Sequence, residues 1–192
     1  MYSLTKKNLA QKGFTLIELL VSMSILLLLV FVAVPGFSNF SSSSRVDSVQ
    51  SSFHSAILVA RNEAIKRNTV VKLCAKQAGS NQCQIPATTS WANGWLVFID
   101  GIDDNDRVLT SSAELLSVAD TISSNVTIKR TTAVGDPARG TMCFSGLGLL
   151  CSDKDNASEF VVDTVSDSGA QYVRKLNISL VGKVLLSSDK YK

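Results

Sequence analysis

Glu18 is the residue whose type and position most directly suggest chemistry. It is the only ionisable side chain between Gly13 and Ser44, and from Leu19 to Val34 every residue is apolar except two serines. Placing a carboxylate in the hydrocarbon core of a membrane costs about 2.5–3.5 kcal/mol even on a lenient insertion scale. A carboxylate in this position is therefore expected to have a function and to interact with a specific partner group. The sequence thus predicts that Glu18 has a function and a partner, and the energetic cost alone does not identify that partner.

The four cysteines form the second set of reactive residues. All lie beyond the apolar stretch, on the side that the basic N-terminus predicts to be outside the cytoplasmic membrane, where disulfides persist. Three pairings are possible, and the short separations favour Cys74–Cys83 and Cys143–Cys151. A zinc site is the alternative, but the spacings are not of the CxxC type, and thiols in an oxidising compartment usually pair.

The remaining polar residues give no support for an enzyme. The only histidine, His54, has no nucleophile or carboxylate at a catalytic spacing, and no glycine-rich phosphate loop follows a strand. The carboxylates Asp100, Asp103, Asp104 and Asp106 could hold calcium, but they lack the EF-hand register, and a solvated turn is the favoured interpretation. We expect no catalytic residue, no cofactor and no metal site.

The segment that positions Glu18 is predicted to be a membrane helix. Residues 14–34 would form roughly 30 Å of helix, which is enough to cross a bilayer core, and the lysines before Gly13 favour a cytoplasmic N-terminus. A secretory signal peptide has the same order of charge and hydrophobicity, but its core is shorter and lacks a carboxylate, and no A-x-A site follows here. An ordinary membrane anchor leaves Glu18 unexplained. Pro35-Gly36 predicts a kink where the apolar run ends.

Beyond a serine-rich link at 38–45, apolar residues recur with helical spacing up to about Arg67. They are Val46, Val49, Phe53, Ile57, Ala60 and Ala64. The link is either a continuation of the helix or a hinge.

The rest of the chain shows short β-type runs bounded by turn residues, which predicts antiparallel sheets packed on the helix and an α+β fold. The expected strands are 69–73, 94–100, 107–109, 125–130, 141–144, 159–163, 172–180 and 183–187.

The net charge is +3, from 19 basic and 16 acidic residues, and three of the lysines precede Gly13. Overall charge therefore gives no reason to expect a nucleic-acid partner.

The N-terminal residues carry a family resemblance. The stretch KGFTLIELLV, residues 12–21, resembles the processing motif of type IV pilins and type II secretion pseudopilins. The resemblance implies that a prepilin peptidase cleaves after Gly13 and methylates the new N-terminal Phe14. It also implies that Glu18 pairs with the N-terminus of a neighbouring subunit, because opposite charges attract strongly in a low-dielectric bundle.

Three further stretches resemble the GspH/FimT class of minor pilins and pseudopilins, in order and spacing. They are ARNEAIKRN (60–68), NGWLVFIDGIDDNDRV (93–108) and RKLNISLVGKV (174–184). The class implies a minor pilin at or near the tip of a type IV pilus, and an H-type minor pseudopilin of a type II secretion system is the alternative. A second alternative is a DNA-binding pilin, because Arg174, Lys175 and Lys183 lie around a Gly182-Lys183-Val184-Leu185 stretch that is similar to a Gly-Arg-x-Arg motif of some members.

Together these observations predict four segments: a leader at 1–13, an assembly and transmembrane helix at 14–37, an amphipathic helix half at 38–68, and a periplasmic β-rich domain at 69–192. The expected location is the inner membrane, followed by a cell-surface pilus. The expected partners are prepilin peptidase, the membrane, and other minor and major pilins.

Overall fold

The computed structural model describes residues 13–84, 91–99, 114–120, 122, 125–131, 140–151, 158–165 and 169–191. The side chains of residues 32–38, 158 and 189–191 are outside this description. The chain divides into two compact units, Met1–Phe37 and Ser38–Lys192.

One helix, α1 (Leu16–Arg67), begins in the first unit and ends in the second. Its end is set by Asn68, which takes a left-handed φ of 49°. The amide of Asn68 donates to the Ile65 carbonyl, and the amide of Thr69 donates to the Ala64 carbonyl. These two bonds form the Schellman arrangement, in which asparagine is a common substitute for glycine. Because α1 is helical throughout its length, the serine-rich link at 38–45 is part of the helix.

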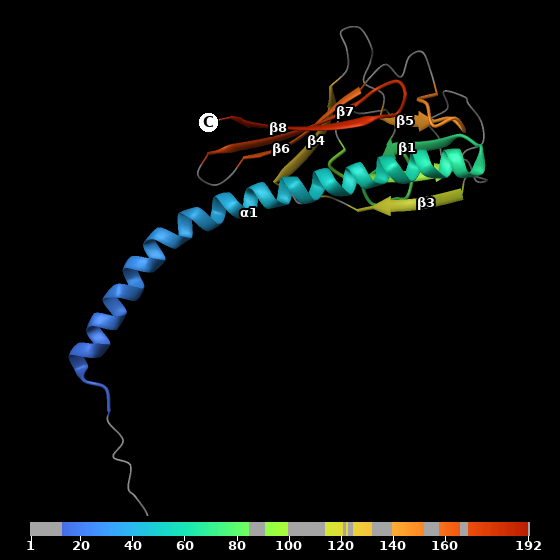
Figure 1. Ribbon diagram of the computed structural model, residues 1–192. Helices are drawn as coiled ribbons and strands as arrows, with labels where there is room; N and C mark the ends of the chain where they lie inside the picture. The colour runs from blue at the N-terminus through green and yellow to red at the C-terminus, as the bar shows by residue number, and fades with distance from the viewer. Residues whose placement is uncertain are drawn as a thin grey trace, which may run out of the picture. The chain divides into compact units, whose positions relative to one another are not determined.

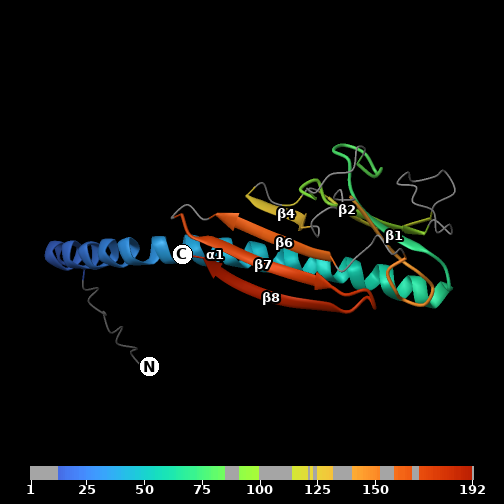
Figure 2. The same cartoon turned by 90° about the horizontal axis from the view of Figure 1, so that it is seen from above.

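The second unit contains two antiparallel four-stranded sheets, with strand orders β3-β2-β1-β5 and β4-β6-β7-β8. Figures 1 and 2 show both sheets beside the second half of α1. The strands are β1 (Val71–Ala75), β2 (Trp95–Ile99), β3 (Glu114–Ala119), β4 (Val126–Thr131), β5 (Thr141–Phe144), β6 (Ser158–Val165), β7 (Gln171–Ile178) and β8 (Val184–Tyr191).

The core lies between α1 and the sheets. The predicted helical stripe is confirmed, because every member is buried except Val49, which is partly buried against the same cluster. Phe53 is at the centre, with its ring centroid 5.4 Å from that of Trp91, 5.0 Å from that of Trp95 and 4.9 Å from that of Phe160. Edge-to-face contacts of this kind add to the stabilisation from apolar burial.

The α+β prediction is confirmed, and seven of the expected strands correspond to strands of the structure within a few residues. The eighth, at 107–109, lies outside the described residues. The strand β3, an edge strand that pairs only with β2, was not predicted from the sequence. Its side chains are exposed or half-buried throughout, so it lacks the alternation of apolar and polar residues that marks a half-buried strand.

Candidate assembly and processing site

The predicted processing residues Gly13 and Phe14 lie just before α1, and Glu18 lies in its first turn. The Thr15 Oγ1 accepts a hydrogen bond from the amide of Glu18 at 3.3 Å, and the Thr15 carbonyl accepts one from the amide of Leu19 at 3.2 Å. Thr15 is therefore the N-cap, and Glu18 takes the third helical position, as in the capping sequence Thr-x-x-Glu. A carboxylate in the first turn also interacts favourably with the helix dipole. The capping sequence Thr15-x-x-Glu18 could have been recognised in the sequence but was not predicted.

The segment that follows presents its side chains outward. Every described residue from Gly13 to Phe31 is exposed, and apart from Thr15, Glu18, Ser22 and Ser24 the residues from Phe14 onward are apolar. The two serines bond back to the helix: Ser22 Oγ donates to the Glu18 carbonyl at 2.7 Å and Ser24 Oγ to the Val21 carbonyl at 2.8 Å. Their hydroxyls therefore need no outside partner.

Among the residues that the structure describes, none of the helices combines the length and the apolar character needed for a membrane span.

In the second unit, Arg174 on β7 fixes the beginning of the packed part of α1. Its side chain is buried, with a residue exposure of 9%. Arg174 Nε donates to Asp47 Oδ1 at 2.7 Å, and its Nη2 donates to Ser43 Oγ at 3.3 Å. One turn further, Gln50 Nε2 donates to the Lys175 carbonyl at 3.3 Å. A buried charge needs such partners, so this contact is a structural one.

Near the other end of the packed part, Arg61 joins α1 to two turns. Its Nε donates to the Gly148 carbonyl and its Nη2 to the Val181 carbonyl, both at 3.1 Å. Residues 148 and 181 belong to the β5–β6 and β7–β8 connections, respectively. One side chain therefore satisfies two turn carbonyls with a charged donor, which strengthens both bonds.

The last turn of α1 carries an exposed ion-pair network. Arg67 Nε donates to Glu63 Oε2 at 2.7 Å, and Arg67 Nη1 donates to Glu114 Oε2 on β3 at 2.8 Å. The hydrogen bond from Arg67 lowers the pKa of Glu63 below its ordinary value of 4.5, and the nearby Lys66 charge acts in the same direction. The same contacts raise the pKa of Arg67.

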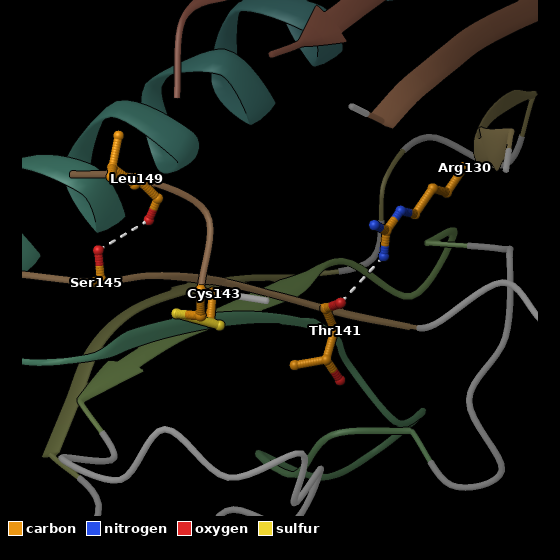
Figure 3. The surroundings of a disulfide bond; sticks show 6 residues. Arg130, Thr141, Cys143, Ser145 and Leu149 are labelled. Carbon is orange, nitrogen blue, oxygen red and sulfur yellow. Dashed lines mark hydrogen bonds between the residues drawn. A yellow bond between two sulfur atoms is a disulfide. The ribbon is translucent and has the colours of Figure 1, made fainter. Parts of the chain in front are cut away.

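Both disulfides favoured by the spacing are present. Cys74 and Cys83 have Cα atoms 5.6 Å apart, and those of Cys143 and Cys151 are 5.5 Å apart, both ordinary separations for a disulfide. Figure 3 shows the second bond, together with Arg130 on β4, whose Nη1 donates to the Thr141 carbonyl on β5 at 3.1 Å. That hydrogen bond connects the two sheets.

The three cations considered for DNA binding do not form one exposed surface. Arg174 is buried and paired with Asp47. Lys175 follows it on the strand and therefore points to the opposite face, where its Nζ lies 3.8 Å from Glu159 Oε1. Only Lys183, in the β7–β8 turn, is exposed. Strand parity could have separated Arg174 from Lys175, but the Asp47 partner is 127 residues away and had no local signal.

The other predicted positions are placed as follows. α1 is helical through Pro35 and Gly36, but their side chains, and any kink there, lie outside the description. The acidic turn, residues 100–106, is also outside the described residues. His54 is half-buried on α1. Within the described part of the chain, no group of three or more histidine, cysteine, aspartate or glutamate residues could hold a metal ion.

Comparison with known proteins gives separate family matches for the N-terminal segment and for the rest of the chain. The model of the prokaryotic N-terminal methylation motif matches residues 8–34, and the family model of the type II transport protein GspH matches residues 50–182. No curated protein matches the chain.

A solved structure of the type IV minor pilin FimU from Pseudomonas aeruginosa, strain PAO1, has the same fold. It is 18% identical with a TM-score of 0.50, and the match covers 80% of this chain and 95% of that one. A second crystal form of FimU gives a TM-score of 0.46 at 18% identity, over 79% of this chain and 96% of that one. The GspH model matches more than half of the 192 residues, and the chain therefore belongs to the GspH family, as a pilin-like protein with an N-terminal methylation motif.

Proposed function

We propose that this protein is a minor pilin, a structural subunit at or near the tip of a type IV pilus that takes part in pilus assembly. Its family and its fold are those of structural pilins rather than of enzymes. The proposal assigns it no catalytic residue and no cofactor.

A single observation carries this proposal. The methylation motif includes an apolar helical segment whose described side chains are exposed instead of being packed against the rest of the chain. The motif model spans residues 8–34, and every described side chain from Gly13 to Phe31 is exposed. An exposed apolar surface of this size requires a membrane or other protein chains around it. A pilin-type subunit meets both requirements, the membrane before assembly and the neighbouring helices afterwards.

In this proposal, prepilin peptidase removes residues 1–13 and methylates the amino group of Phe14, which leaves a mature chain of 179 residues out of 192. Cleavage creates a cationic amino group at the end that carries Glu18. In the filament, the Glu18 carboxylate pairs with the N-terminal amino group of a neighbouring subunit. A charge buried in the bundle without such a partner would be strongly penalised.

The proposed route begins in the inner membrane, with a single pass and with the second unit in the periplasm, and ends at the cell surface. Two features support it. The methylation motif and the pilin family suggest a membrane-anchored subunit. All four cysteines are in disulfides, which form and persist in oxidising compartments.

An H-type minor pseudopilin of a type II secretion system is the second candidate, because the matching family model is that of the type II transport protein GspH. Both candidates use the same helix, motif and carboxylate. They differ in the machine that receives the subunit.

Deleting the gene in its own host separates the two candidates. The proposal expects fewer surface pili by electron microscopy, unchanged secretion of exoproteins, and recovery of piliation when the full chain is restored. Normal piliation with exoproteins retained in the periplasm would replace the pilus assignment by the secretion assignment. Normal piliation and normal secretion would contradict both.

A further inference from the structure

Two turns beside the end of α1 carry aliphatic residues at exposed positions. In the β5–β6 connection Leu147 is 78% exposed, and in the β7–β8 turn Leu180 and Val181 are 53% and 58% exposed. Turns normally carry polar residues and glycine at such positions. We call residues 145–151 and 179–183 the turn platform.

The turn platform is held together as one unit. The amide of Leu150 donates to the Leu180 carbonyl at 3.1 Å. Arg61 donates to a carbonyl of each turn. The two backbones approach so closely that a Cβ atom on Gly182 would lie 2.5 Å from the Gly148 oxygen. Side chains on such a support are already positioned, which lowers the ordering cost of binding.

The Cys143–Cys151 loop adds further constraints. The Ser145 amide donates to the Leu149 carbonyl at 2.8 Å, and the Ser145 hydroxyl donates to the same carbonyl at 3.3 Å (Figure 3). The Cys151 amide donates to the Cys143 carbonyl at 3.2 Å. The disulfide closes the same loop. The exposed aliphatic residues are therefore held by a loop that hydrogen bonds and a disulfide constrain, as expected for a contact surface.

The charge around the turn platform indicates the kind of partner. Within residues 145–151 and 179–183, all of which the structure describes, Lys183 is the only charged side chain, and Arg61 brings a second cation beneath the turns. A symmetric contact between two copies would place the same patch against itself and bring like charges together, which is unfavourable. The complementary surface is apolar and bordered by carboxylates.

We propose that the turn platform is the contact site for the globular domain of a different pilin-type subunit in the same assembly, one that presents an apolar surface with an acidic border. This inference rests on the proposed function and adds a partner surface to it. The chain enters the second unit at Ser38, whereas the platform is bonded to Arg61, near the other end of α1. Within the second unit, the platform is therefore bonded to the part of α1 that is far along the helix from the residue where the chain enters.

Site-specific photo-crosslinking in the native host tests the proposal on the full chain. A benzophenone amino acid is placed at Leu147 or, as a matched control, at Val165. Val165 is 60% exposed and lies at the end of β6 that pairs with Gln171, at the opposite end of the sheet from the β7–β8 turn. The expected result is a crosslink at position 147, absent at 165, to another protein that carries an N-terminal methylation motif.

A crosslink from position 147 to a second copy of this chain, to a protein without that motif, or to nothing in assembled filaments would overturn the proposal. So would equal crosslinking from positions 147 and 165.

Charge substitutions give an independent readout. Val181→Asp should lower the amount of this subunit in sheared filaments by about tenfold, whereas Val165→Asp should leave it within about twofold. Protease resistance and disulfide formation check that both variants are folded. Equal recovery of the two variants would overturn the platform proposal. The proposed function would still stand if Glu18→Val prevented incorporation, and it would fall separately if Glu18→Val had no effect.

Discussion

The two halves of α1 have the same secondary structure and opposite surroundings. From Leu16 to Phe31 every described side chain is exposed, although nearly all are apolar. From Val46 to Ala64 most of the apolar residues form a stripe that is buried against both sheets, whereas Leu58 and Val59 are exposed on the outer face beside polar residues. Helix stability in proteins comes mainly from packing of an apolar face. The second half receives that packing from its own chain, whereas the first must receive it from the membrane or from other subunits.

The charged residues follow the same division. In the second half, Asp47 is paired with Arg174 within the chain. In the first half, the backbone amide of Glu18 donates to Thr15 Oγ1, and the Glu18 carboxylate forms no ion pair with the described residues, so we look for its charged partner in another subunit. The comparison predicts that substitutions in the first half affect assembly, whereas those in the second half affect the stability of the domain.

The largest effect is expected from Glu18→Val. The variant should remain in the membrane fraction, because the change makes the helix more apolar. Its amount in sheared filaments should fall by at least about tenfold, because the amino group of a neighbour then has no carboxylate partner. Immunoblots of membrane and filament fractions measure both quantities. Equal loss from both fractions would indicate instability instead of an assembly defect.

Phe53→Ala should have the largest effect on stability. Removing a fully buried ring that contacts three other rings should lower the free energy of unfolding by about 3–5 kcal/mol. Phe40→Ala is the control, because Phe40 is on the same helix and 69% exposed. It should change stability by less than about 0.5 kcal/mol. Denaturant unfolding of the detergent-solubilised chain measures the free energy of unfolding of both variants. Similar decreases in the two variants would contradict the claim that this part of α1 is stabilised by its buried face.

Removal of the second disulfide should have a smaller effect. Replacing Cys143 and Cys151 together by serine should lower the free energy of unfolding by about 2–4 kcal/mol, because the unfolded chain is no longer constrained. Denaturant unfolding of the oxidised protein and of the double variant gives the difference. A variant as stable as the oxidised protein would mean that the bond does not stabilise the domain.

Asp47→Asn tests the first ion pair of the packed half. The neutral amide leaves the Arg174 charge, which is buried, with a weaker acceptor, so the free energy of unfolding should fall by about 1–3 kcal/mol. Hydrogen exchange should also rise in residues 43–50. Arg45→Gln, at an exposed position on the same turn, should change neither quantity. An unchanged exchange rate in Asp47→Asn would show that the pair does not hold the helix.

Glu63→Gln should have the smallest effect, and that effect should depend on pH and salt. Because the pKa of Glu63 is lowered in the folded protein, its ion pair adds stability above pH 4.5, and this contribution is lost as the pH falls through the folded pKa. The wild type and the variant should therefore converge in acid and in high salt. Thermal unfolding at several pH values measures the difference. A gap between them that persists in acid would contradict this assignment.

Features of the structure could be predicted from the sequence when the interacting residues are close together along the chain. The helical stripe and the end of α1 near Arg67 were predicted correctly because they follow from local periodicity and turn residues. The disulfides were predicted because their partners are only 9 and 8 residues apart. The pairing of Arg174 with Asp47 spans 127 residues, and Arg61 contacts turns 87 and 120 residues away. Such contacts arise from the tertiary fold and leave no pattern in the local sequence.

The most direct test of the central claim is the N-terminal chemistry of the protein recovered from its host, with and without prepilin peptidase. Intact mass and N-terminal sequencing should show an N-methylated Phe14 when the peptidase is present and an uncleaved chain when it is absent. A chain that keeps Met1 in both strains, or a cut near Gly36 that is independent of the peptidase, would contradict the account.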